Sequence, residues 1–250
     1  MAREIWLFFV LMNVLSPQFV KNFFSNSYTN SALWAFLTID FLFICIHFSV
    51  GVYIFFMDLN TWGDLTNLLV TTEGGYSEYF QYFKYLMIIG CIAYLIMYKK
   101  RYGHFLWLVL FTVFFFDDAF EFHERIGVFI AQTFDIQPII GLRGRDFGEL
   151  VYVTAVGTLF LIVGILSWKK SSTRFKYISL DITLLVGFFL FFGIGLDLAH
   201  AFSGENRYLG FLLGLLEDGG EMLALSLLGW YFLLLTQRTK TNEAYLFDML

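Results

Sequence analysis

Carboxylates and histidines occur within or beside four apolar stretches of this sequence, where charged side chains are costly and usually functional. The motifs "DFGE", "DLAH" and "EDGGE" each place two such side chains on one face of a helix, about one turn apart. Carboxylate oxygens combined with imidazole nitrogens predict a binding site for a divalent metal ion. The candidate ligands are Asp117, Glu121, His123, Glu124, Asp146, Glu149, Asp197, His200, Glu217, Asp218 and Glu221.

Gathered in one patch, these carboxylates would repel one another, and a bound divalent cation would remove that conflict. Carboxylates from several helices together with histidines form the ligand set of di-iron and di-manganese bundles, in which paired Glu-x-x-His motifs supply the histidines. This sequence has one comparable motif, Asp197-x-x-His200. The pattern therefore predicts a divalent metal ion as the cofactor and leaves Fe, Mn, Zn and Ca undistinguished.

The composition indicates which elements position these ligands. Of the 250 residues, 58% are hydrophobic and 15% are charged, and the mean hydropathy is +0.69. Soluble domains carry about 25% charged residues. The chain is therefore predicted to be an all-α, polytopic transmembrane helix bundle that forms a single integral membrane domain over residues 1–250. Its two cysteines, Cys45 and Cys91, form no CxxC motif, so a thiolate metal site is not expected.

Six apolar segments approach or exceed the ~20 residues that an α-helix needs to cross a bilayer. They cover residues 33–57, 82–98, 105 to about 128, 147–168, 178–202 and 208–235. The N-terminal segment 5–24 has a charged start and an apolar centre, interrupted near Pro17. We expect it to be a retained seventh helix, in preference to a cleaved signal peptide or an interfacial helix.

Basic residues follow the second, fourth and sixth of these apolar segments. The positive-inside rule predicts that these three regions, including the C-terminus, are cytoplasmic, in a cytoplasmic or plasma membrane. The acidic ends of the helices then face outward. The basic residues are Lys99, Lys100, Arg101, Lys169, Lys170, Arg174, Lys176, Arg238 and Lys240.

The acids of four predicted helices lie at similar depths in the membrane. Counted from the cytoplasmic ends at about 1.5 Å per residue, Asp117 lies about 20 Å deep, and Glu149 and Asp197 lie about 28 Å deep. These depths fall in the outer third of a ~30 Å hydrocarbon core. Glycines share the acidic face on three of the helices, which predicts that these faces point into the bundle. His123 lies about 120° from the stripe that Glu121 and Glu124 form, and joins it only if the helix ends or bends nearby.

The preferred hypothesis is a metal-dependent enzyme that acts on a lipid or small apolar substrate at the outer face. A cation or proton transporter is an alternative, although only Asp40 and Asp181 continue the acids toward the cytoplasm. A non-catalytic subunit of a larger membrane complex is another, because 33 Phe residues provide large packing surfaces. Expected partners are membrane lipids and other membrane subunits, with no nucleic acid.

A purely structural role for the acids also stays open. Four arginines fall on the same predicted side of the membrane and could neutralise the carboxylates in a network of salt bridges. Asp40 and His47, which share a helix face, are expected to hydrogen-bond within the bundle rather than to relay protons. The four arginines are Arg125, Arg143, Arg145 and Arg207.

Overall fold

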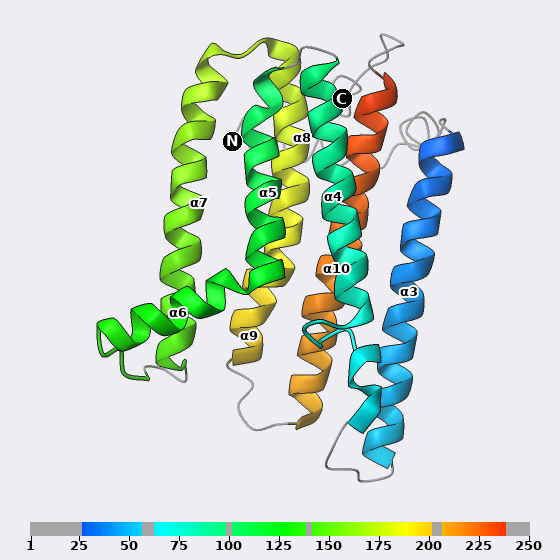
Figure 1. Ribbon diagram of the computed structural model, residues 1–250, viewed down its shortest axis with the longest axis vertical. Coiled ribbons are helices and arrows are strands. Elements are labelled where there is room, and N and C mark those ends of the chain that lie inside the picture. Colours follow the sequence, from blue (N-terminus) through cyan, green and yellow to red (C-terminus); the bar gives the residue numbers. More distant parts are fainter. Residues whose placement is uncertain (1–26, 57–62, 99–101, 139–141, 202–206, 239–250) are drawn as a thin grey trace, which may run out of the picture.

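The computed structural model describes residues 27–56, 63–98, 102–138, 142–201 and 207–238, and its elements are helices (Figure 1). The short η segments are 3₁₀ turns, except η3, which is a π-helix. The elements are α3 Ser27–Phe56, η1 Gly63–Leu68, α4 Tyr76–Met97, η2 Tyr102–His104, α5 Phe105–Phe120, α6 Phe122–Thr133, α7 Gly144–Lys170, α8 Thr173–Leu190, η3 Phe191–Leu196, α9 Asp197–Ala201 and α10 Arg207–Arg238.

Five stretches of the described chain are long and apolar enough to cross a membrane: α3, α4, α7, the α8–η3–α9 run, and α10. The predicted all-α membrane bundle is therefore confirmed. A sixth and a seventh span stay predictions. The sixth would be α5, which runs beside the others but has 16 residues (Figure 1). The predicted N-terminal span lies outside the described residues.

The third apolar segment, predicted as one helix to about residue 128, is two helices. α5 ends at Phe120, Glu121 adopts a left-handed conformation (φ 51°, ψ 41°), and α6 starts at Phe122. α6 runs across the end of the bundle instead of along it (Figure 1). The left-handed residue changes the direction of the chain, so His123 does not follow the helical register that runs through Asp117. The break that His123 required to join the acidic cluster therefore exists, and it occurs at Glu121.

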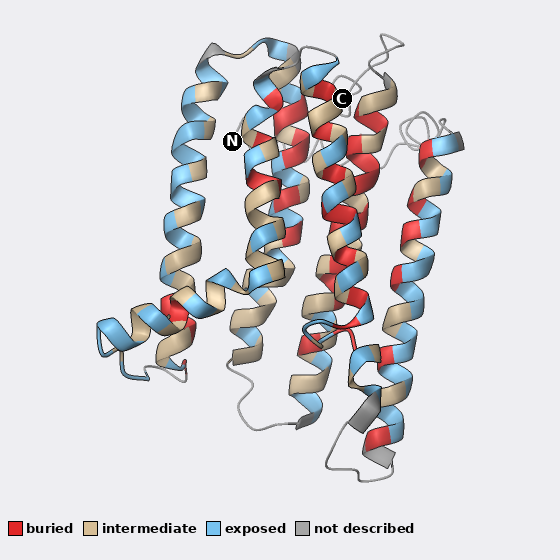
Figure 2. Cartoon of the chain, in the orientation of Figure 1, coloured by how far each residue is buried: buried red, intermediate tan, exposed pale blue. Residues whose placement is uncertain are grey.

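The core of the bundle lies around α10, which packs against α3, α4 and α8. Buried residues gather on α4, α8 and α10, whereas α7 is exposed or half-buried along most of its length (Figure 2). Over its most apolar stretch, 72% of α10 is buried and none of α7 is. The α7 helix therefore lies at the periphery of the bundle.

A fully buried ion pair joins three helices of this core. Lys84 Nζ on α4 lies 2.5 Å from Asp40 Oδ1 on α3 and donates a hydrogen bond to the Met222 carbonyl oxygen on α10 at 3.0 Å. Ser226 Oγ, also on α10, donates to Asp40 Oδ2 at 2.5 Å. His47 does not contribute to this network, because its Nδ1 accepts a hydrogen bond from the Val70 backbone at 3.0 Å. The ion pair with Lys84 and the hydrogen bond from Ser226 therefore fix the Asp40 carboxylate in the core.

Two glycines let α6 and α7 approach closely. A Cβ atom on Gly148 would collide with the Gly127 carbonyl oxygen, and one on Gly127 would lie 2.5 Å from Glu149 Cγ. Such close contact between backbones requires residues without side chains. The pair fixes α6 to the start of α7.

We expect Gly148→Ala to destabilise the protein by about 1–3 kcal/mol, because the methyl group has no room against α6. The matched control is Gly157→Ala on the same helix, where nothing lies within 4 Å of the added Cβ. Thermal unfolding in detergent measures both. Equal melting temperatures for the two variants would show that the glycine contact does not matter.

Candidate functional site

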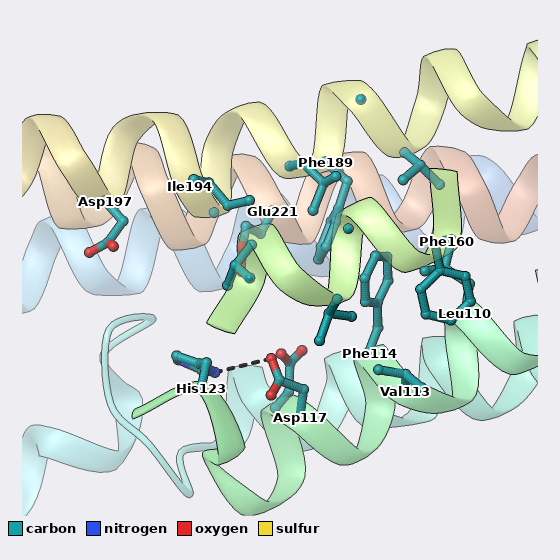
Figure 3. Close-up of a pocket in the computed structure, with 18 of the residues that line it drawn as sticks. Leu110, Val113, Phe114, Asp117, His123, Phe160, Phe189, Ile194, Asp197 and Glu221 are labelled. Carbon is teal, nitrogen blue, oxygen red and sulfur yellow. Dashed lines mark hydrogen bonds and ion pairs between the residues drawn. The ribbon is translucent and has the colours of Figure 1, made fainter. Parts of the chain in front are cut away.

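A large cavity of about 1050 Å³ lies between α4, α5, α7, α8 and α10. Its two ends differ in chemistry. Asp117, His123, Asp197 and Glu221 gather at one end, and apolar side chains such as Phe160 line the other (Figure 3). We call these the acidic end and the apolar bore.

All of the ligands predicted from the sequence line this cavity. Side chains from four separate helical regions therefore face one cavity, as depth and helical periodicity predicted, and their role as a binding site stays a prediction. Their ability to bind a metal ion depends on how each carboxylate is already paired. Most of these residues sort into three groups by their partners, and Asp197 and Glu121 belong to none of the three.

The first group is neutralised by arginine. Arg145 lies between Glu124 on α6 and Glu149 on α7, with N–O distances of 3.2 and 2.9 Å. Arg143 Nη2 contacts Asp146 Oδ1 at 2.8 Å, and its backbone N–H donates to Asp146 Oδ2 at 2.8 Å. The arrangement at Arg143 and Asp146 caps the start of α7. For these three carboxylates the salt-bridge interpretation is the one that the structure supports.

The second group pairs a carboxylate with a histidine. His123 Nδ1 lies 3.2 Å from Asp117 Oδ2, and Tyr152 donates to the other Asp117 oxygen at 3.1 Å. His200 Nδ1 lies 3.1 Å from Glu217 Oε2. A carboxylate on one ring nitrogen fixes the imidazole and leaves the other nitrogen, Nε2, for a ligand, as in many metal sites. The bend at Glu121 is what brings His123 to Asp117.

The third group consists of Asp118, Asp218 and Glu221, which we call the deep carboxylates. They interact electrostatically with one another, and none of them forms an ion pair with a described residue. Asp118 also faces the fully buried Tyr85 hydroxyl. Three carboxylates close together without a cation are unfavourable unless protons or a bound cation neutralise them.

The Glu221 carboxylate packs against Gly193 of the π-helix η3. A Cβ atom on Gly193 would fall on the Glu221 carboxylate, so a larger residue there would require the carboxylate to move. A π-helical turn inside an α-helical run is unusual and is often found at functional sites. It also rotates Asp197 at the start of α9 toward the cavity, where Figure 3 shows it.

The predicted convergence of many ligands on one ion is not seen. Among the residues that the structure describes, no three His, Cys, Asp or Glu side chains are placed to hold one metal ion. The pairing explains why: arginines and histidines engage the carboxylates of the first two groups. Glu121 is only loosely engaged, with its Oε2 atom 3.7 Å from Arg125.

Two residues of the acidic end escaped the sequence analysis. Asp118 follows Asp117 by one residue, so it lies about 100° from the Asp117 stripe. It faces Tyr85 on α4 instead, a side that only the packing of α4 reveals. Gln81 on α4 is 8% exposed and lines the cavity, and its Oε1 atom has no hydrogen-bond partner among the described residues. An unpaired, buried acceptor beside carboxylates calls for a ligand that brings positive charge or hydrogen-bond donors.

The excess of acidic residues also shifts the pKa values of groups at the edge of the cavity. Glu73, in the segment before α4, has a raised pKa because of burial and of repulsion by Glu124 and Glu121. His123 lies on α6, outside the five spans. Burial alone would lower its pKa, but the hydrogen bond and charge of Asp117, together with Asp118 and Glu149, raise the pKa to about 9.

This shift predicts a pH dependence of stability. Because the folded pKa of His123 is about 9 and its unfolded value is near 6.5, the stabilisation is complete below about pH 6.5 and is lost as the pH rises through about 9. We expect at most about 1 kcal/mol, since the side chain is partly exposed. Melting temperatures of the wild type and His123→Gln, measured from about pH 6 to about pH 10, should converge at the alkaline end. Curves that stay parallel would contradict this assignment.

The fold and the cavity define the class of this protein: a multi-pass integral membrane helix bundle with a bipartite internal cavity. The chain belongs to the family described as Domain of unknown function (DUF8692), whose model matches residues 56–236. No curated protein and no solved structure matches the chain.

Proposed function

We propose that this protein binds an amphiphile in the cavity and uses a divalent cation at the acidic end to act on its polar head. One observation carries the proposal: the cavity joins an apolar bore to deep carboxylates that lack a cationic partner among the described residues. Ligand sites in proteins are typically mostly apolar, with a few converging polar groups. This cavity follows that pattern.

The deep carboxylates supply the first ligands of the proposed cation. Asp118 comes from α5, and Asp218 and Glu221 come from α10. The proposal requires these side chains to turn toward one another, because no three ligands are placed to hold an ion among the described residues. His200, paired with Glu217, would lie beside them. A ligand set dominated by oxygen favours Ca or Mn over Zn. Such an ion would polarise an oxygen of the bound head group or activate a water molecule.

The arginine-paired carboxylates have a different part in this proposal. Arg145 joins α6 to α7 across Glu124 and Glu149, at the rim of the cavity. These residues close the acidic end and position α6, and they leave the deep carboxylates to meet the ligand. Loss of Arg145 would affect the shape of the site more than its charge.

A transmembrane ion path is less well supported. Asp40, which would have continued the path, is fully buried and held by Lys84 and Ser226. Asp181 accepts a hydrogen bond from the buried Tyr231 hydroxyl at 2.5 Å. Buried carboxylates that are paired in this way have a structural role.

Metal analysis tests the proposal. Protein purified without chelators is expected to contain stoichiometric divalent metal, and Glu221→Gln is expected to lose it, because the variant removes a charged ligand. Asp135→Asn is the matched control: it removes an exposed carboxylate near the same end, and asparagine also tolerates the positive φ at that residue (48°). Absence of metal from the wild type, or unchanged content in Glu221→Gln, would refute the cation.

A further inference from the structure

The apolar bore has a shape and lining of its own. It is lined by Leu110 and Phe114 of α5, Phe160 of α7 and Phe189 of α8 (Figure 3). The carboxylates lie at the other end, and the polar lining residues beyond the bore, such as Ser167 and Ser179, carry no acidic group. The cavity therefore has a long apolar part that the carboxylates do not explain.

The bore is elongated. Along α7 its lining extends from Leu150 to Ile165, which at about 1.5 Å per residue is about 23 Å. The whole cavity holds about 1050 Å³. An elongated and mostly apolar space of this size suits one extended hydrocarbon chain.

Two glycines face this space without a packing partner. Glycines in membrane helices usually allow neighbouring helices to approach. Gly157 on α7 and Gly187 on α8 both line the cavity, yet no atom of the described residues outside their own helix backbone lies within 4 Å of a Cβ built on either of them. Their lack of a side chain leaves the bore open and serves no helix contact.

The α7 wall of the bore is accessible from the membrane. α7 packs mainly against α6 at the acidic end and to a lesser degree against α5. None of its most apolar stretch is buried, and Leu159, Leu161 and Ile162 are exposed. In a bilayer, hydrocarbon chains surround these surfaces and can reach the bore past α7.

We infer that the bore holds one extended hydrocarbon chain, drawn from the membrane past α7, whose hydrogen-bond-donating head lies at the acidic end beside Gln81. The unpaired Oε1 atom of Gln81 provides an acceptor for such a head. This assignment rests on the proposed function for the chemistry at the head, whereas the chain contacts themselves need no cation.

Equilibrium binding of radiolabelled hexadecanol to the detergent-purified chain tests the inference. We expect saturable binding to the wild type, and binding at least about tenfold weaker for Gly157→Phe and Gly187→Phe, because either ring occupies space that several methylene groups would fill. Gly90→Phe is the matched control, since Gly90 is exposed on α4, has no atom within 4 Å of its Cβ position, and does not line the cavity. Only variants that elute as a single species with the wild-type melting temperature are compared.

The outcomes separate this inference from the proposed function. Binding that persists in EDTA and in Glu221→Gln supports the chain site even where no metal is found. No saturable binding to the wild type, or equal binding by Gly157→Phe, Gly187→Phe and Gly90→Phe, overturns the chain site whatever the metal content. Hexadecane serves as the headless probe: affinity equal to that of hexadecanol would overturn the role given to Gln81.

Discussion

Replacing Lys84 with methionine is expected to destabilise the bundle by about 3–5 kcal/mol, the cost of leaving a buried charge without its partner. Asp40 would then lie fully buried, with Ser226 as its one remaining partner among the hydrogen bonds described above. The Met222 carbonyl would also lose the hydrogen bond from Lys84. Because these contacts join α3, α4 and α10, the loss should affect the whole core rather than one helix.

A double variant separates the ion pair from its surroundings. Asp40→Asn alone should be similarly destabilising, since it leaves Lys84 charged and buried. Asp40→Asn combined with Lys84→Met should recover a large part of the loss, because neither charge is then left unpaired. Reversible unfolding in mixed micelles gives the free energies of unfolding. If the losses of the two single variants simply add, the two side chains act independently and the ion pair does not stabilise the bundle.

This ion pair also marks a limit of sequence analysis. Lys84 falls within a segment whose apolar character otherwise predicts a membrane helix, and the helix extends back to Tyr76, several residues before the predicted start. A single lysine near a predicted boundary looks interfacial. Only the packing of α4 against α3 and α10 shows that its ammonium group is fully buried.

The acidic end was easier to predict, because depth in a membrane is readable from sequence. Each helix crosses the same apolar thickness, so residue counts place Asp117, Glu149 and Asp197 in the same outer third of the membrane. Pairing across helices follows different rules. That Arg145 contacts Glu149 on its own helix and Glu124 on another depends on the close approach of Gly127 and Gly148, a tertiary contact that no count of residues contains.

The position of His123 also depends on tertiary packing rather than on residue counts. A regular helix turns it away from Asp117, and its contact with Asp117 requires the left-handed backbone at Glu121. Non-glycine residues seldom adopt that conformation, so no propensity of Glu121 predicts it. Helix type and depth follow from local apolar periodicity, whereas the break in α5–α6 depends on what the two halves pack against.

Adding one methyl group at the π-helix, with Gly193→Ala, is expected to weaken divalent-cation binding by about 10–100-fold, the range typical of residues that orient a metal ligand. The new Cβ would fall on the Glu221 carboxylate and push it away from Asp118 and Asp218. Gly195→Ala on the same π-helix is the control, because its Cβ would meet Phe191 at an ordinary contact distance of 3.4 Å.

Calorimetric titration of chelator-treated protein with Mn²⁺ compares the affinities of the wild type and the two variants. Gly193→Ala changes no ligand and no charge, so weaker binding in this variant alone would show that the position of Glu221 sets the affinity. Equal weakening in Gly195→Ala would instead mean that any alanine in the π-helix perturbs the bundle. Unchanged affinity in Gly193→Ala would show that the Glu221 carboxylate can move without loss of cation binding. The contact with η3 would then not hold the deep carboxylates in place.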